Sequence, residues 1–456
     1  MRREKIVSQS GRRVHVVMVP GFGGFDALGQ MQYYAGLTPA FRRWMSADDL
    51  RRNVVLHYFD SFPTAAVVTR AARLRSYLAK RIARGEFQPG DRVSLVGHST
   101  GGLDVRRLLH DLAASPDNAV SVDGGHGTAC AVTSGEVLGF VHRAVFLSVP
   151  HWGTNIADWV RAHATARIAA VADLRVAVAA SQLPFAAALR DWLARGAMHV
   201  ADAGLFRAIE DALAEIDPAV GEVGPTRTAA AHEAAAELGL WLRHMLWDFS
   251  ALDDLAPERP MGSAEAPAHA VSPAGEDEPR GWTEAAGHAI LARSYATLGR
   301  CPFPFAGPEI PTWELLRPGT YPECFLKADA DVVYRACYRA CAGGPFRRTI
   351  PDGAPKFLRP SHRQTIQSWQ RRVGLERWDN DGIVNTASMF WPDEHGTFLV
   401  PADHMDIVGH YQPVRAFAGT GRKYQAYDLL GSCSGFNDTL FEQVWNDVFT
   451  FCWSPR

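Results

Sequence analysis

The chain has 456 residues, of which 47% are hydrophobic and 21% are charged, and its formal net charge at pH 7 is −2. This length and apolar content allow a large buried core, while the balanced charge excludes the basic surface expected of a nucleic-acid-binding protein. A membrane-spanning segment is also excluded, because the longest uncharged apolar stretch of the middle region, 176–189, is too short and contains Pro184.

The N-terminus and the cysteines bear on where the protein works. Basic residues come early, but the only apolar run after them, 14–20, is too short for a signal peptide. We therefore expect a cytoplasmic protein, or a secreted one if a leader is missing from this chain. The seven cysteines form no C-x-x-C pair, which favours scattered thiols. Cys337 and Cys341, on an expected helix over 329–342, leave metal binding or pairing open.

The first part of the chain, 1–154, alternates short apolar runs with helical patterns. The expected strands are 14–19, 53–58, 93–96 and 141–149, and the expected helices run over 65–84 and from 103 onwards. The first helix has apolar residues at 68, 74, 78 and 82 and a basic outer face. Strands that alternate with helices in this way predict a mostly parallel sheet with helices on both faces.

The rest of the chain divides into three parts. Residues 155–254 are Ala-rich, which predicts a helical insertion that serves as a lid or cap, with simple helix packing as the alternative. Residues 255–284, rich in Pro, Ala, Glu and Gly, are expected to form a flexible linker. Residues 285–456 return to the core pattern. The expected elements there are strands at 288–298 and 397–400, a Pro-rich insertion with one helix at about 301–378, and an amphipathic helix over 437–452.

Ser99 lies at the centre of a G-x-S-x-G sequence, 97–101, between an expected strand and an expected helix. This context is that of a nucleophile elbow, a tight turn that exposes a serine hydroxyl at the carboxyl edge of a sheet and at a helix N-terminus. We expect glycine at Gly97 and Gly101 because a Cβ there would collide with the neighbouring strand or helix. A serine in an ordinary turn is the alternative.

A serine hydroxyl is a poor nucleophile near neutral pH, so it requires a base, which in turn requires an orienting carboxylate. In this architecture both follow the serine, the acid before the histidine. Asp381 precedes a glycine in a turn and His404 follows the last expected strand, so we assign them these roles. Asp379 and Asp403 are the alternative acids. Histidines that fit the order or placement less well are His98, whose ring should point away from the serine, His151, His395 and His410.

The negative charge that develops on the substrate requires two backbone N–H donors, the oxyanion hole. We expect one from Thr100, directly after the serine, and one from Phe22 in the glycine-rich segment 21–24 after the first strand. A merely glycine-rich turn is the alternative. Candidate substrate contacts beside these motifs are Phe25, Trp152 and Met405.

Several segments together resemble the true bacterial lipases of the α/β-hydrolase superfamily and occur in that family's order. They are PGFGG at 20–24, GHSTGG at 97–102, PHWGT at 150–154, NDGIVNT at 380–386 and DHMD at 403–406. The resemblance implies an α/β-hydrolase fold with a mostly parallel central sheet, helices on both faces and an inserted helical lid. It also implies the roles already assigned to the nucleophile Ser99, the acid Asp381, the base His404 and the oxyanion donors Phe22 and Thr100.

The resemblance bears on metals as well, although no cofactor is required. Some relatives hold calcium through a carboxylate two residues after the catalytic histidine, which Asp406 matches, but no upstream aspartate clearly matches the second ligand, so calcium is left open. The zinc cluster of one branch would need an aspartate where Thr69 stands, although Asp248 matches another ligand, and we expect no zinc. Pro20 replaces the usual histidine before the first oxyanion glycine.

These observations predict a carboxylic-ester hydrolase, a lipase or esterase, that acts on lipophilic acyl esters through an acyl-enzyme. The expected partner is a lipid or another hydrophobic ester, met at a lipid–water interface if the insertion is a lid. The sequence does not set the oligomeric state. Alternatives on the same triad are a short-chain esterase, a polyester depolymerase and an acyltransferase. A peptidase and a non-catalytic binding scaffold complete the alternatives.

Overall fold

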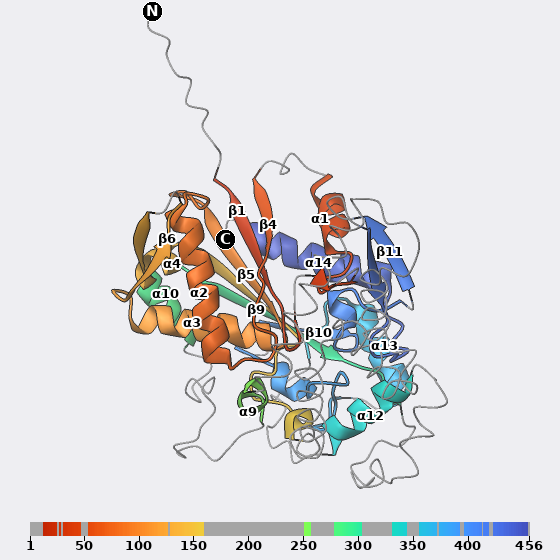
Figure 1. Ribbon diagram of the computed structural model, residues 1–456. Coiled ribbons are helices and arrows are strands. Elements are labelled where there is room, and N and C mark those ends of the chain that lie inside the picture. The colour runs from red at the N-terminus through yellow and green to blue at the C-terminus, as the bar shows by residue number, and fades with distance from the viewer. Residues whose placement is uncertain are drawn as a thin grey trace, which may run out of the picture.

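The computed structural model describes residues 12–24, 27–28, 31–46, 53–125, 128–158, 250–256, 278–302, 331–343, 355–371, 374–392, 396–412, 414–418 and 423–454. At its centre is a six-stranded sheet in the order β10-β9-β8-β5-β1-β4, in which every neighbouring pair is parallel (Figure 1). The strands are β1 (Val14–Val19), β4 (Val54–Tyr58), β5 (Arg92–His98), β8 (Val141–Leu147), β9 (Leu291–Leu298) and β10 (Thr397–Pro401). The predicted parallel sheet is confirmed.

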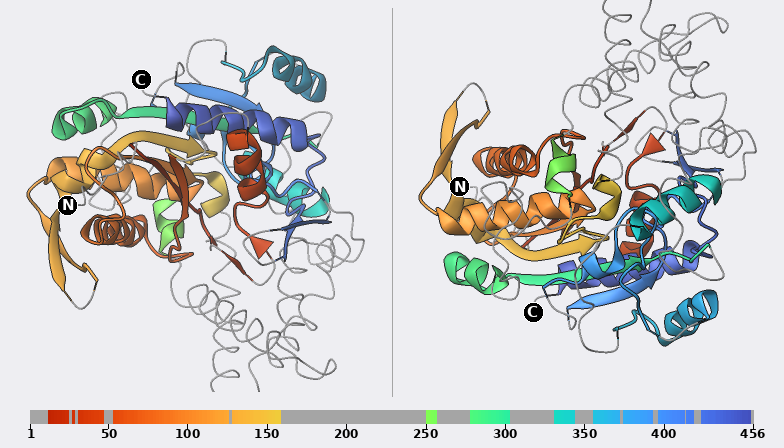
Figure 2. Two further views of the ribbon diagram at one scale, coloured as in Figure 1. Left: turned by 90° about the horizontal axis from the view of Figure 1, so that it is seen from above. Right: turned by 90° about the horizontal axis from the view of Figure 1, so that it is seen from below.

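Helices cover both faces of this sheet, and β1 shows why its apolar run is continuous. Val16 and Met18 enter a buried cluster with α1 (Leu37–Ser46) and α14 (Asp438–Trp453). Val17 and Val19, the alternate residues, enter a second cluster with α2 (Val67–Ala83) and α3 (Thr100–Ala114). Figure 2 shows these two layers of helices on either side of the strands.

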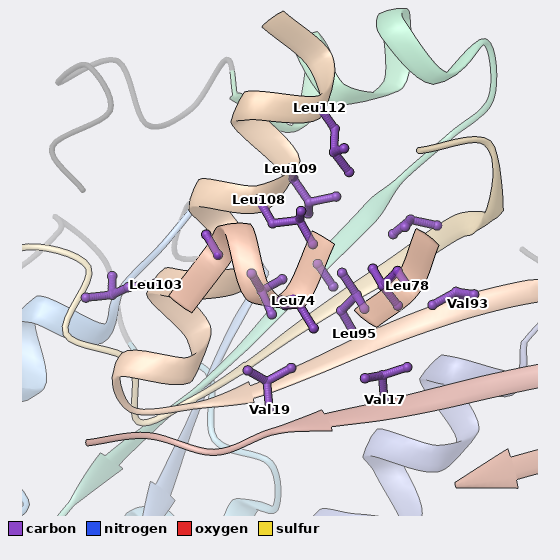
Figure 3. Close-up of a cluster of buried hydrophobic side chains, with 14 of the residues drawn as sticks. Val17, Val19, Leu74, Leu78, Val93, Leu95, Leu103, Leu108, Leu109 and Leu112 are labelled. Carbon is purple, nitrogen blue, oxygen red and sulfur yellow. The ribbon is translucent and has the colours of Figure 1, made fainter. Parts of the chain in front are cut away.

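The cluster beneath α2 and α3 is built largely from leucine and valine. Figure 3 shows these side chains converging between the helices and the sheet, among them Leu74, Leu78, Leu108, Leu109, Val17, Val19 and Leu95. Burying each such side chain contributes roughly 1.5–3 kcal/mol. The predicted face of α2 is partly wrong, because Val68 is 40% exposed while Arg70 is fully buried. That exchange brings a charged side chain into the interior, next to the site described below.

The sequence pattern does not predict several peripheral elements. The strands β6 (Ala119–Asp123) and β7 (Ala129–Thr133) form an antiparallel hairpin, followed by α4 (Ser134–Phe140). A four-stranded sheet has the order β11-β12-β3-β2. Its strands are β2 (Ala27–Leu28), β3 (Met31–Gln32), β11 (Val414–Ala418) and β12 (Lys423–Tyr427). Short 3-10 turns cover Thr386–Met389 and Asp406–Val408.

Two expectations for the second half of the chain need correction, one boundary and one number of helices. The flexible linker expected over 255–284 ends earlier, because Glu278–Ala286 form α10, in which Trp282 is buried and Glu278 makes a 2.6 Å ion pair with Arg106. The expected insertion at 301–378 contains not one but two described helices, α12 (Asp331–Ala342) and α13 (Pro360–Gln370). Of the expected lid, only 155–158 and 250–254 are described, and the latter stretch contains the short helix α9 (Ala251–Asp254). The rest of the lid lies outside the described residues.

The order of the strands brings distant segments to one edge of the sheet. Val19 of β1 is paired with Gly97 of β5, and Leu147 of β8 with Tyr295 of β9, so the carboxyl ends of these strands lie together. A serine-bearing turn follows the interior strand β5, and the segments after β9 and β10 join it at that edge. The chain therefore has the predicted α/β-hydrolase fold. None of the helices in the described part of the chain is both long and apolar enough to cross a membrane.

Candidate active site

Ser99 occupies the turn between β5 and α3 with φ 53° and ψ −131°, a conformation that residues other than glycine rarely adopt. Its N–H donates to the carbonyl of Leu147 at 2.9 Å, which ties the turn to the end of β8. A Cβ on Gly97 would lie 2.5 Å from the backbone of α3, and one on Gly101 would lie 2.4 Å from the carbonyl oxygen of Val19. Both glycines are therefore needed for the close packing that the sequence predicted, and the turn has the geometry of a nucleophile elbow.

His404 and Asp381 are in direct contact. Nδ1 of His404 lies 2.8 Å from Oδ2 of Asp381, and both side chains are buried. Because a carboxylate only accepts, Nδ1 carries the hydrogen, and in the neutral ring Nε2 then has the lone pair. The same carboxylate accepts from the N–H groups of Ile383 and Val384 at 3.0 and 2.8 Å, and from the Thr297 hydroxyl at 2.6 Å. Four donors thus fix its orientation.

The turn that carries Asp381 is held from behind by α12. Nδ2 of Asn380 donates to the carbonyl of Tyr338 at 3.2 Å, and Nδ2 of Asn385 donates to that of Cys341 at 3.1 Å. The Cys341 carbonyl belongs to the last turn of α12, where no N–H partner exists within the helix. The two asparagines of the N-D-G-I-V-N sequence therefore act as supports for the acid. Cys341 is a free, buried thiol, and burial raises its pKa well above the usual value.

His404 also lies beside the elbow. Nε2 of His98, the residue before the serine, contacts the carbonyl oxygen of His404 at 2.9 Å, and the centroids of the two imidazole rings are 4.7 Å apart. Nδ1 of His98 lies 2.6 Å from the hydroxyl of Tyr33. Both nitrogens of His98 are therefore bonded within the fold, so His98 is not free to act as a base. The structure thus brings together the segments that carry all three predicted groups.

The glycine-rich segment after β1 approaches the nucleophile closely. A Cβ placed on Gly21 would lie 2.6 Å from the Cβ of Ser99. The N–H groups of Gly21, Gly23 and Gly24 donate to Tyr33 Oη, to the carbonyl of Pro63 and to that of Gly21, at 2.8, 2.8 and 2.9 Å.

Among the described residues, the N–H of Phe22 has no such acceptor. Thr100 is the first residue of α3, so its N–H lacks a carbonyl within the helix. Within the described part of the chain, both predicted donors are therefore left without a backbone acceptor, one directly after Ser99 and one directly after Gly21.

A buried ion pair supports this glycine-rich segment and is absent from the sequence prediction. Arg70 of α2 donates to the carbonyl oxygen of Pro20 at 3.0 Å and to Oδ2 of Asp104 of α3 at 2.8 Å, and neither charged side chain is exposed. Burial raises the pKa of Asp104 to about 7, against the opposing effect of Arg70. The only signal in the sequence is one arginine on the apolar side of the helical repeat. The prediction of a basic outer face for α2 did not separate Arg70 from the exposed arginines.

The alternative acids have structural roles. Oδ2 of Asp379 accepts from the N–H of Glu376 at 2.8 Å, which closes a turn. Asp403 accepts from the N–H groups of Met405 and Asp406 at 2.8 and 3.0 Å. Among the contacts of the described residues, neither carboxylate meets the ring of His404.

The other histidines are also placed by the structure. His151 stacks on Trp391 with centroids 5.0 Å apart, and Nε2 of His410 contacts the carbonyl of Tyr33 at 3.1 Å. His395 lies outside the described residues.

The candidate substrate contacts receive less support. Phe25 lies outside the described residues, whereas Trp152 and Met405 are half-buried and pack against hydrophobic clusters. The ring of Trp152 lies 6.0 Å from the guanidinium of Arg106. A cavity of about 430 Å³ is bordered by α12, α13 and the segment at 432–433, and its lining includes none of the predicted site residues.

The carboxylate of Asp406, the candidate calcium ligand, is hydrogen-bonded within the fold. Oδ2 of Asp406 accepts from the N–H of Asp403 at 2.8 Å and from the hydroxyl of Ser434 at 2.6 Å, so it closes the turn that carries His404. Burial and the charge of Asp403 raise the pKa of Asp406 well above its usual value. In the described part of the chain, no cluster of three or more metal-binding side chains occurs.

No family model matches the chain, and no curated protein matches it by sequence. Solved structures that resemble it include lipase 1 from Pelosinus fermentans, with 15% identity, 96% of this chain and 98% of that chain covered, and a TM-score of 0.38. For EstA from Clostridium botulinum the values are 14%, 95%, 88% and 0.36. For the Staphylococcus hyicus lipase they are 13%, 97%, 96% and 0.39. Similarity at these scores carries no inference about activity, and the chemistry of the site follows from its own residues.

Proposed function

We propose that the protein is a serine hydrolase that cleaves carboxylic esters. The observation that carries this proposal is the 2.8 Å contact between His404 and Asp381. The carbonyl oxygen of His404 also accepts from His98, the residue before Ser99, which brings this pair to the serine turn. A serine in a strained turn, an imidazole with a free Nε2 lone pair and an oriented carboxylate are the groups required for acyl transfer.

In this mechanism Ser99 is the nucleophile. His404 Nε2 takes the hydroxyl proton while Oγ bonds to the ester carbonyl carbon, and Asp381 stabilises the resulting imidazolium. The N–H groups of Phe22 and Thr100 hold the negative oxygen. The carbonyl–alkoxy bond then breaks, and the alcohol leaves with the proton from Nε2. Water attacks the acyl-serine, gives its proton to His404, and the acid is released with regeneration of the hydroxyl.

We further propose that the ester is lipophilic, as in a lipase or an esterase for longer acyl chains. The support is the set of motifs that resemble bacterial lipases, namely the segments at 150–154, 380–386 and 403–406. The hydroxyl of Thr154 in the first donates to the carbonyl of Ile383 in the second, and Asp381 of the second contacts His404 of the third. A short-chain esterase, a polyester depolymerase or an acyltransferase would use the same triad, so the substrate series must decide between them.

The test compares the wild-type protein with Ser99→Ala on p-nitrophenyl esters of increasing chain length, both soluble and emulsified. We expect wild-type hydrolysis that rises with chain length and a loss of at least about 10³-fold in Ser99→Ala. Fluorophosphonate labelling of wild type but not of the variant provides a second readout. Equal rates in the two proteins would remove the proposal, and a preference for the shortest ester would replace the lipase by a short-chain esterase.

A further inference from the structure

A chain of hydrogen bonds runs from the oxyanion segment to the base loop behind Ser99. The N–H of Gly21 donates to Tyr33 Oη at 2.8 Å, Tyr33 Oη contacts Nδ1 of His98 at 2.6 Å, and Nε2 of His98 contacts the carbonyl oxygen of His404 at 2.9 Å. Gly21 precedes Phe22, His98 precedes the nucleophile, and His404 is the base. The links therefore join the three segments that carry the reacting groups.

The direction of every hydrogen bond in this chain follows from its ends. The carbonyl oxygen of His404 only accepts, so Nε2 of His98 must donate to it, and Nδ1 of the neutral ring must then accept. The Tyr33 hydroxyl consequently donates to Nδ1, and its oxygen accepts from the N–H of Gly21. Each hydrogen has one acceptor.

The surroundings of Tyr33 and His98 keep both side chains neutral. Tyr33 and His98 are 5% and 0% exposed, so water does not compete for these bonds. Burial, together with the neighbouring His404, holds the pKa of His98 well below its usual value, and burial raises the pKa of Tyr33. A neutral imidazole and a neutral phenol are the forms that this pattern of donors requires.

Tyr33 is itself fixed by the base loop. Nε2 of His410 contacts the backbone carbonyl of Tyr33 at 3.1 Å, and a Cβ on Gly409 would lie 2.0 Å from the carbonyl oxygen of Ala35. The segment 33–35 is therefore packed directly against the loop that follows His404. A displacement of the base loop would pull on Tyr33 from both its backbone and its hydroxyl.

We propose that Tyr33 and His98 form a positioning pair that holds the oxyanion segment and the base loop in register with Ser99. The pair touches no reacting atom. Its role rests on the proposed hydrolase function, because it acts through the N–H of Phe22, which follows Gly21, and through the imidazole of His404. In such sites a misplacement of about 1 Å costs up to about 10²-fold in rate.

Tyr33→Phe removes the hydroxyl while it retains the ring. Because the interaction acts on groups that are used in the transition state, we expect kcat to fall about 10- to 100-fold with little change in KM. His98→Leu should give a similar loss, whereas His98→Gln, whose amide can still donate toward His404, should recover part of it. The double variant Tyr33→Phe/His98→Leu should lose less than the product of the two single losses, because either change breaks the same chain.

The matched control is Tyr295→Phe, which also removes a fully buried hydroxyl, bonded in this case to Asp447 of α14 at 2.5 Å. It should lower Tm while kcat stays near the wild-type value. A kcat loss in Tyr33→Phe no larger than in Tyr295→Phe, or single losses that multiply in the double variant, would overturn the positioning role.

A second measurement separates this inference from the proposed function. NMR of the protein labelled with ¹⁵N-histidine should show His98 as the neutral tautomer with hydrogen on Nε2, and Tyr33→Phe but not Tyr295→Phe should shift the signals of His404. This readout holds even if no ester is hydrolysed. Unchanged His404 signals in Tyr33→Phe would refute the coupling on their own.

Discussion

At the scale of single residues, the carboxylate of Asp381 shows how the site is held. It accepts four hydrogen bonds. One of them comes from Thr297, near the end of β9 and 84 positions away along the chain. Thr297 Oγ1 also lies 2.8 Å from the hydroxyl of Ser148, which can donate to it. Thr297 thus links the carboxylate to the end of β8 and limits its rotation about the bond to His404.

Thr297→Val should therefore loosen the acid without changing the volume of the site. We expect kcat/KM for a p-nitrophenyl ester to fall about tenfold, in the range known for loss of a hydrogen bond to a charged group. Thr297→Ser, which keeps the hydroxyl, is the control and should retain most of the activity. A Val variant as active as the Ser variant would show that the backbone N–H groups alone fix the carboxylate.

The sequence predicts the reacting residues better than the residues that hold them. Order along the chain, a glycine after Asp381 and a strand before His404 are sufficient to select these two side chains. Arg70 and Tyr33 carry no comparable local signal, because their roles depend on contacts with segments 12 to 65 residues away. A pattern read along one helix treats an arginine as exposed, and only the packing of α2 on α3 shows the contrary.

At the scale of secondary-structure elements, the elbow depends on how closely α3 approaches β1. A Cβ on Gly101 would lie 2.4 and 2.5 Å from the carbonyl oxygens of Val19 and Pro20, and backbone atoms cannot yield as a flexible side chain can. Gly101→Ala should therefore destabilise the protein by about 1–3 kcal/mol or more and reduce ester hydrolysis. Thermal unfolding and kcat would be measured together.

Gly139→Ala provides the matched control. Gly139 lies in α4, and nothing is within 4 Å of the position that its Cβ would occupy. Alanine there should raise stability by roughly 0.5–1 kcal/mol through helix propensity and leave activity unchanged. If Gly101→Ala behaved like Gly139→Ala, close packing would not explain the glycine of the elbow.

The strands that the sequence does not predict are short, are polar, or pair with strands far away in the sequence. The hairpin of β6 and β7 has alternating side chains and Asp123-Gly124-Gly125 at its turn, so its period and its turn residues are present in the sequence. The strands β2 and β3 have two residues each, and β3 pairs with β12 almost 400 residues away, which leaves little local pattern. Long apolar strands, in contrast, were located to within a few residues.

At the scale of the whole molecule, the two ends of the sheet carry different histidine chemistry. At the amino end, Nε2 of His15 lies 3.2 Å from Oδ2 of Asp91, and Nδ1 of His15 lies 2.9 Å from Nε2 of His57. Burial lowers the pKa of both histidines, that of His57 to about 3, with Arg81 and Arg13 contributing in the same direction and Asp91 opposing it at His15. Folding therefore holds both rings neutral.

This cluster should make the fold sensitive to acid. An unfolded chain protonates His57 near pH 6.5, whereas folding lowers the pKa of His57 to about 3, so stability is lost as the pH falls through 6.5 toward about 3. The lowered pKa of His15 acts in the same direction. His57→Gln, which cannot titrate, should reduce the drop in Tm between pH 7 and pH 4.5 by a few degrees Celsius. Identical Tm–pH curves for the variant and the wild type would show that the cluster contributes nothing to acid sensitivity.

The pairing of β8 with β9 has a consequence for when ester hydrolysis can begin as the protein folds. The part of the chain up to β8 supplies the serine, and the part from β9 onwards supplies the acid and the base. More than 140 residues separate the two strands. A polypeptide that ended before β9 would carry the serine but neither the acid nor the base, so it could not hydrolyse an ester. The appearance of ester hydrolysis during refolding would consequently report that the two parts have joined along β8 and β9.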